Sequence, residues 1–98
     1  MSLEGSWDVT FTTTVGKTTE TWSIAPDGAG LRLHSKAETG EEVDEALTVD
    51  GDAFSFQIPL PNMPLKATIA GARDGDTLTG TGKLAAMQFG TFEAVRSV

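Results

Sequence analysis

The sequence contains no cysteine and no tyrosine, and its 98 residues include a single histidine. Without cysteine the chain can form neither a disulfide framework nor a thiolate metal site or nucleophile, so its stability must come from packing. Without tyrosine, and with one histidine, most of the side chains that transfer protons in enzymes are missing. We therefore expect a binding or interaction domain without a cofactor, and not an enzyme.

Long apolar runs and an excess of positive charge are also missing. No apolar stretch approaches the roughly 18 residues needed to span a bilayer, and residues 1–5 lack the basic region that opens a signal peptide. Fourteen acidic residues against seven basic ones give a net charge of −7, which repels phosphate backbones and anionic lipids. We expect a cytoplasmic protein that contacts neither nucleic acid nor membranes, although a removed signal peptide would leave no trace.

What the sequence does contain is an evenly spaced series of turn signals. Glycine-centred breaks occur at Val15-Gly16, Asp27-Gly28, Thr39-Gly40, Asp50-Gly51 and Asp74-Gly75, and a proline-rich segment at 59–64 fills the one wide gap. Asp-Gly suits a two-residue hairpin turn because glycine adopts positive φ freely and aspartate tolerates it. Regular turns between short segments are typical of an all-β sandwich or barrel.

The segments between the turns alternate apolar and polar residues with period two. In the first segment, Trp7, Val9 and Phe11 alternate with polar residues. The apolar sets of the other segments are Trp22 with Ile24, Leu31 with Leu33, Val43 with Leu47 and Val49, Phe54 with Phe56, Ile58 and Leu60, Leu65 with Ala67 and Ile69, Leu78 with Leu84, and Phe92 with Ala94. Each segment is therefore a strand with one apolar face, and helix is limited to a turn near residues 84–87.

A weak internal repeat predicts how the strands connect. An Asp-Gly turn with leucine or phenylalanine three residues after its glycine recurs once per hairpin, in segments 26–31, 49–54 and 73–78. A succession of hairpins gives a meander, and closing eight strands removes the exposed edges that a flat sheet would leave. We predict one domain over residues 1–98, an all-β, eight-stranded antiparallel up-and-down meander closed into a small barrel.

Closure of the barrel brings the first and last strands together. If the first strand runs upward, the three Asp-Gly turns lie at the lower end with the start of this strand and the end of the last one. Trp7 and Arg96 then become neighbours, and the guanidinium can lie on the indole face. We predict that this contact closes the lower end of the barrel.

The residues at this junction resemble those of a known superfamily. Gly5-Ser6-Trp7 at the start of the first strand and Arg96 at the end of the last resemble the Gly-x-Trp and terminal arginine arrangement of the calycins, which include lipocalins and avidin-like barrels. The C-terminal half, with Asp74-Gly75-Asp76, Thr79-Gly80-Thr81 and Phe89-Gly90-Thr91-Phe92, also resembles small bacterial domains of lipocalin-like pattern. The resemblance implies a lipocalin-like barrel that binds a small apolar or amphipathic ligand at its mouth.

The candidate ligand site lies at the upper end, opposite the Asp-Gly turns. Its loops carry the apolar residues Leu60, Met63, Met87 and Phe89, which suit a mouth that receives an apolar molecule. Beneath them, the alternation places apolar walls at Trp22, Ile58, Leu65 and Leu84 and polar groups at Glu20, Ser35 and Glu45. We call the four apolar loop residues the rim. Two alternatives stay open for the rim, since its side chains either fold inward or form a dimer surface. The two glutamates either face the interior or turn to solvent at bulges or strand ends.

The interior of such a barrel is either filled by its own side chains or holds one small ligand. Gly80, Gly82 and Ala67 are the small residues that would leave space, but strand glycines also relieve crowding or allow strong coiling. The two candidate functions are therefore a small-ligand binder and a ligand-free interaction domain that forms homodimers.

No metal site is expected from the sequence. His34 alternates with apolar Leu33, which predicts an exposed position on the outer face, and no second histidine exists to build a zinc site. Asp50-Gly51-Asp52 and Asp74-Gly75-Asp76 lack the full run of oxygen ligands of a calcium loop, so we interpret them as turns.

Overall fold

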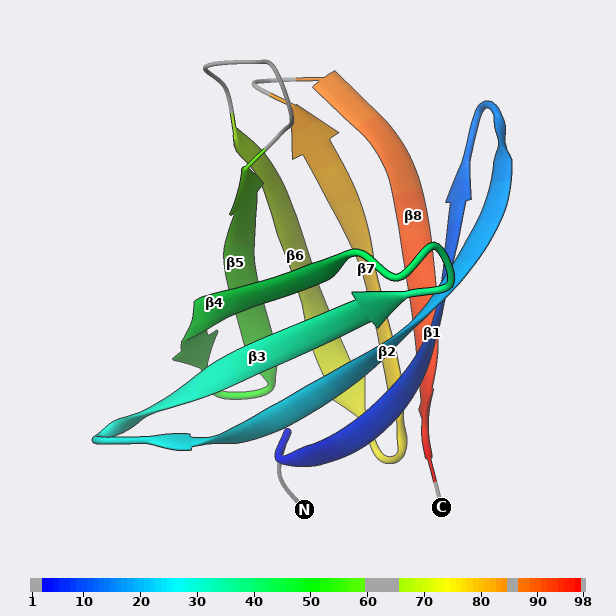
Figure 1. The fold of residues 1–98 in the computed structure, drawn as a ribbon. Helices are drawn as coiled ribbons and strands as arrows, with labels where there is room; N and C mark the ends of the chain where they lie inside the picture. Colours follow the sequence, from blue (N-terminus) through cyan, green and yellow to red (C-terminus); the bar gives the residue numbers. More distant parts are fainter. Residues whose placement is uncertain (1–2, 60–65, 85–86, 98) are drawn as a thin grey trace.

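The computed structural model describes residues 3–59, 66–84 and 87–97, and its eight antiparallel strands close into a barrel (Figure 1). The strands are β1 (Gly5–Thr13), β2 (Gly16–Asp27), β3 (Gly30–Ala37), β4 (Glu42–Asp50), β5 (Ala53–Pro59), β6 (Lys66–Asp74), β7 (Thr77–Leu84) and β8 (Met87–Arg96). They follow one another around the barrel in chain order, and β1 pairs with β8. The predicted closed up-and-down meander is therefore confirmed.

Some expectations fall on parts of the chain outside this description. Leu60, Met63 and Leu65 lie outside the described residues, as do residues 85 and 86 of the predicted helical turn. Leu84 and Met87, on either side of that turn, are strand residues. Within the described ranges, no helix is long and apolar enough to cross a membrane.

The turns at the lower end have the backbone conformation that their Asp-Gly sequences predict. Gly28, Gly51 and Gly75 have φ angles of 64°, 64° and 63°, in the left-handed region that glycine adopts without steric cost. These turns lie at the same end of the barrel as the start of β1 and the end of β8 (Figure 1). We call this end the lower end.

Two of these turns are held by arginines from neighbouring strands. Arg73 donates through Nη2 to Asp52 Oδ1 at 2.9 Å, and Arg96 donates through Nε to Asp76 Oδ1 at 2.9 Å. The backbone N–H groups of the same arginines donate to the carbonyls of the same aspartates at 2.8 and 3.0 Å. The second aspartate of each Asp-Gly-Asp sequence is thus engaged by an arginine, and no metal-holding group of acidic or histidine side chains is found in the described part of the chain.

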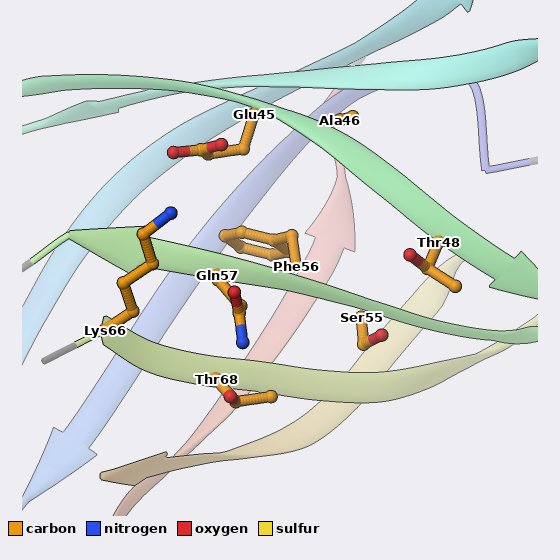
Figure 2. Close-up of a pocket in the computed structure, with 8 residues that line it drawn as sticks. All are labelled: Glu45, Ala46, Thr48, Ser55, Phe56, Gln57, Lys66 and Thr68. Atoms are coloured by element: carbon orange, nitrogen blue, oxygen red, sulfur yellow. The ribbon is translucent and has the colours of Figure 1, made fainter. Parts of the chain in front are cut away.

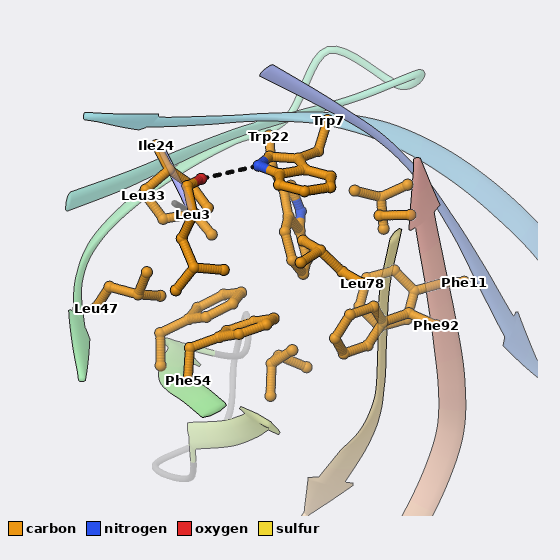
Figure 3. Packing of buried hydrophobic residues seen from close by; sticks show 14 residues of the cluster. Leu3, Trp7, Phe11, Trp22, Ile24, Leu33, Leu47, Phe54, Leu78 and Phe92 are labelled. Carbon is orange, nitrogen blue, oxygen red and sulfur yellow. Dashed lines mark hydrogen bonds between the residues drawn. The ribbon is translucent and has the colours of Figure 1, made fainter. Parts of the chain in front are cut away.

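The lower end is closed by the predicted contact between Trp7 and Arg96. The two residues are paired across β1 and β8, and the Arg96 guanidinium carbon lies 4.3 Å from the centroid of the Trp7 ring. Arg96 Nη1 also donates to the Glu4 carbonyl at 2.8 Å, and Trp7 Nε1 donates to the Leu3 carbonyl at 2.9 Å (Figure 3). Trp7 is fully buried, and its indole N–H and the Nε and Nη1 atoms of Arg96 all donate hydrogen bonds.

Beside Trp7, a cluster of five aromatic rings fills the middle of the barrel. Four of them, Phe11, Trp22, Phe54 and Phe92, are labelled in Figure 3. Trp22 lies at its centre, with ring centroids 5.1 Å from Phe92, 5.3 Å from Phe56, 6.2 Å from Phe54 and 6.3 Å from Phe11. All five side chains are buried. Edge-to-face and tilted rings at these separations attract one another in addition to burying apolar area. The middle of the barrel is therefore packed by its own side chains.

The strand glycines make room for these rings instead of leaving space for a ligand. A Cβ atom on Gly80 would stand 2.5 Å from the Phe92 ring and 2.2 Å from the Ala70 carbonyl oxygen. At Gly82 it would stand 2.7 Å from the Phe89 ring. The expectation that Gly80 and Gly82 provide free volume is wrong, because aromatic side chains occupy that volume. The alternative, that these glycines relieve crowding, is correct.

Candidate functional site

At the upper end, the structure brings three predicted site residues together around one carboxylate. Trp22 Nε1 donates a hydrogen bond to Glu20 Oε1 at 2.5 Å, and the Ser35 hydroxyl bonds to the same carboxylate. Trp22 and Ser35 face each other across β2 and β3, and both are buried. Glu20 is half-buried beside them, so it faces the interior and does not turn into solvent.

The protonation of Glu20 reflects two opposing effects. Burial disfavours the charged form and raises the pKa of the Glu20 carboxyl above its ordinary value of 4.5. The hydrogen bonds from Trp22 and Ser35 favour the charged form and oppose that rise, but burial is the larger effect. Glu20 is thus a carboxyl group fixed in position by buried donors and less acidic than an exposed glutamate.

The apolar residues predicted around this group differ in their exposure. Ile58 and Leu84 are half-buried at the upper ends of β5 and β7. Phe89 is 37% exposed and lies over Gly82, beside the position of Ile69. Met87 is 75% exposed and points away from the core. Phe89 therefore packs partly inward, as one interpretation of the rim predicts, and Met87 does not. The dimer surface stays a prediction.

A β-bulge accounts for the position of Phe89. Gly82 pairs with Gly90 and Lys83 pairs with Gln88, so Phe89 is an extra residue in β8. An extra residue reverses the alternation of side chains along a strand. Phe89 and Phe92 can therefore both reach the interior although they are three residues apart. Two aromatic residues at odd spacing in one strand are the sequence signal that could have revealed this bulge.

Glu45 lies at a different place, a cleft in the barrel wall between β4 and β5 (Figure 2). We call it the wall cleft; its volume is about 290 Å³, and it is lined by Glu45, Ala46, Thr48, Ser55, Phe56, Gln57, Lys66 and Thr68. Glu45 is half-buried there. The sequence predicts Glu45 beside Glu20 and Ser35, but in the structure it lines the wall cleft, which no pattern in the sequence predicts.

His34 occupies the exposed outer face, as its place in the alternation predicts. Its Nε2 lies 2.9 Å from Glu42 Oε1 and its Nδ1 lies 3.8 Å from Asp44 Oδ2. Asp44 also accepts a hydrogen bond from Arg32. These side chains form a polar network across β3 and β4 at the solvent surface, where such contacts contribute little to stability.

Comparison with known proteins shows the fold but no family. No protein-family profile and no curated protein match the chain. A redesigned β-barrel is similar with a TM-score of 0.74 at 18% identity, over 98% of this chain and 92% of that chain. The redesigned β-barrel mFAP1, solved bound to DFHBI, has a TM-score of 0.69 at 19% identity, over 96% and 94%. A de novo designed fluorescence-activating β-barrel has a TM-score of 0.58 at 16% identity, over 97% and 94%. At these low identities, the structural similarity shows the small eight-stranded antiparallel barrel fold and does not show a family or a function.

Proposed function

We propose that this protein is a calycin-like barrel that binds a small amphipathic molecule at its upper end, with the Glu20 carboxyl as the polar anchor. The observation that carries the proposal is the half-buried Glu20, hydrogen-bonded to buried Trp22 and Ser35. Burying a carboxyl group costs free energy, and the hydrogen bonds from Trp22 and Ser35 offset this cost only in part, because burial is the larger effect on its pKa. A few fixed polar groups among apolar walls are the usual composition of a small-molecule site.

The surroundings of Glu20 define the chemistry of the proposed ligand. A carboxylate accepts hydrogen bonds, so the polar end of the ligand is a hydroxyl or an amine. Half-buried Ile58 and Leu84, together with the ring of Phe89, offer apolar surface to its body. Because the aromatic cluster fills the barrel at and below Trp22, the ligand would lie above that ring and be small. The proposal includes no catalytic step.

Two findings support ligand binding in a barrel of this type. The redesigned barrel mFAP1, which shares the fold, was solved bound to DFHBI. The junction of Trp7 and Arg96 has the arrangement that the resemblance to calycins implies, with the guanidinium over the indole. Both make a lipocalin-like binding role the best-supported function for the chain.

The proposal is tested by titrating the fluorescence of Trp22 with octanol, octylamine and octanoate. We expect octanol and octylamine to change the emission and octanoate to bind more weakly, because its charge has the same sign as Glu20. Trp7 is fully buried beneath Arg96 at the lower end, so it supplies a constant background.

The matched variant for this test is Glu20→Gln, which keeps a hydrogen-bond acceptor but removes the charge. It should bind octanol as before and octylamine about tenfold more weakly, as expected for loss of a charge-assisted hydrogen bond. If none of the three ligands alters the emission of the folded wild-type protein, the upper end is not a binding site.

A second candidate function is self-association through the upper end. Val15, in the turn between β1 and β2, is 95% exposed, and Met87 at the start of β8 is 75% exposed. Apolar side chains at one end of a molecule suit a dimer surface. Native mass spectrometry should then show a homodimer that Met87→Gln weakens, whereas a monomer at micromolar concentration would remove this candidate.

A further inference from the structure

The wall of the barrel is interrupted between β4 and β5. These strands pair at only three positions, from Asp50 with Ala53 to Thr48 with Ser55, whereas β3 and β4 pair at six and β1 and β2 at nine. Beyond Thr48 and Ser55, residues 45–47 of β4 and 56–58 of β5 have no strand partner across this edge among the described residues. These residues pair with β3 and β6 on their other sides, so only the peptide groups that point across this edge are open to a ligand in the wall cleft.

Two side chains of opposite charge face the wall cleft from its two sides. Glu45 extends from β4 and Lys66 from the first residue of β6, and their charged ends point toward the same space near the end of β5 (Figure 2). Within the described ranges, neither side chain forms an ion pair. An anion and a cation on opposite sides of a small cleft are complementary to a molecule that carries both charges.

Beside these charges, the wall cleft includes the apolar ring of Phe56 (Figure 2). Phe56 is 4% exposed, and its ring packs edge-to-face on Trp22 with centroids 5.3 Å apart. The remaining surface includes the Ser55 hydroxyl and the Gln57 amide, which can donate and accept hydrogen bonds. The cleft therefore combines one apolar contact, two opposite charges and neutral polar groups within about 290 Å³.

We propose that the wall cleft binds a free α-amino acid with an apolar side chain. Its ammonium group would contact Glu45, its carboxylate would contact Lys66, and its side chain would lie on Phe56. The cleft is slightly smaller than the roughly 300–1,000 Å³ typical of drug-sized ligands, which suits a molecule of this size. This site is separate from the Glu20 site at the upper end, so the inference does not rest on the proposed function.

The charges of β4 favour this ligand over a second copy of the chain. Pairing β4 with β4 of a second copy would bring Glu42, Asp44 and Glu45 close to the same three acidic residues. Like charges on adjacent strands are destabilising, and the net charge of −7 adds to the repulsion. The interior of an extended peptide carries neither of the terminal charges that match Glu45 and Lys66.

The test uses three ligands of the same shape: L-leucine, 3-methylbutylamine and 4-methylpentanoate. They are titrated into the ¹⁵N-labelled protein, and binding is followed through the amide resonances of residues 45–48 and 55–57. We expect leucine to shift these resonances, and we expect each analogue with a single charge to bind at least about tenfold more weakly.

Two charge variants separate the roles of the two side chains. Glu45→Gln should weaken the binding of leucine and 3-methylbutylamine about tenfold and leave the binding of 4-methylpentanoate no weaker. Lys66→Gln should weaken the binding of leucine and 4-methylpentanoate about tenfold and leave that of 3-methylbutylamine no weaker. The matched controls are Glu93→Gln on β8 and Lys17→Gln on β2, exposed residues outside the cleft that should leave all three affinities unchanged. Glu20→Gln should also leave leucine binding unchanged, which distinguishes this site from the one at the upper end.

Several results would overturn the proposal. Equal binding of the three ligands would show that only the apolar contact matters, and resonance shifts confined to residues outside the cleft would place leucine elsewhere. Leucine binding that survives in a folded Glu45→Gln, Lys66→Gln double variant would exclude recognition by charge. Absence of leucine binding at its solubility limit would also refute it, even if an extended peptide binds the cleft.

Discussion

The lower and upper parts of this barrel differ in how completely their polar groups and strands are paired. At the lower end, Arg73 and Arg96 hold Asp52 and Asp76, and the guanidinium of Arg96 covers the buried Trp7. In the upper part, β8 has a bulge, β4 separates from β5, and carboxyl groups extend into the interior or the wall. Charged groups pair with one another at the lower end, whereas Glu45 and Lys66 in the upper part form no ion pair among the described residues and remain available to other molecules.

This difference indicates where stability and where function are concentrated. A barrel needs one well-packed region to fix its strand order and register, and here that region is the lower end together with the aromatic cluster. Once these are fixed, the upper part can keep a half-buried carboxyl and unpaired strand edges without loss of the fold. Substitutions at the lower end should therefore change stability, and substitutions in the upper part should change mainly binding.

The largest effect is expected for Trp7→Ala. The indole is fully buried, donates to the Leu3 carbonyl and supports the Arg96 guanidinium, so its removal should lower the free energy of unfolding by about 3–5 kcal/mol. The comparison variant is Phe89→Ala in the upper part, where partial exposure limits the expected loss to about 1 kcal/mol. Urea denaturation measures the free energy of unfolding of both variants, and equal losses would mean that the two ends contribute equally to stability.

A smaller effect is expected for Gly80→Ala in the middle of the barrel. The new Cβ atom would stand 2.2 Å from the Ala70 carbonyl oxygen, so the backbone of β6 must move and not only the Phe92 ring. Overpacking of this kind costs about 1–3 kcal/mol. Gly30→Ala is the matched control, because a Cβ atom there would meet no other atom within 4 Å. If urea denaturation gives Gly80→Ala the same free energy of unfolding as the wild type, the close packing of β6 and β7 does not contribute to stability.

The fold was predictable because its signals are local. Asp-Gly turns at even spacing and period-two alternation mark the strands, and strand order then places Trp7 beside Arg96. The features of the upper part were not predictable in the same way. The short pairing of β4 with β5 depends on how the closed barrel bends, which no local pattern encodes. The bond between Glu20 and Trp22 depends on side-chain conformation, although the alternation correctly placed both on one face.

The smallest effect is expected for Glu20→Gln, and it depends on pH. In the folded protein burial raises the pKa of this carboxyl above 4.5, whereas in the unfolded chain it keeps its ordinary value. The folded state therefore binds the proton more tightly, and this contribution to stability is fully present below pH 4.5. It is lost as the pH rises through the folded-state pKa, because the charged carboxylate is less well solvated in the barrel than in water.

In the Glu20→Gln variant the glutamine side chain is uncharged at every pH and can still accept the hydrogen bonds from Trp22 and Ser35. The variant should match the wild type in acid and exceed it slightly in stability above the folded-state pKa. Urea denaturation of both proteins from about pH 3.5 to 8 measures this difference, from which the titration of the other carboxyl groups cancels. Glu93→Gln, an exposed change on β8, should show no such trend. A wild type that gains stability over Glu20→Gln as the pH rises would show that the donors outweigh burial, and that the upper end retains this carboxylate for stability and not for a ligand.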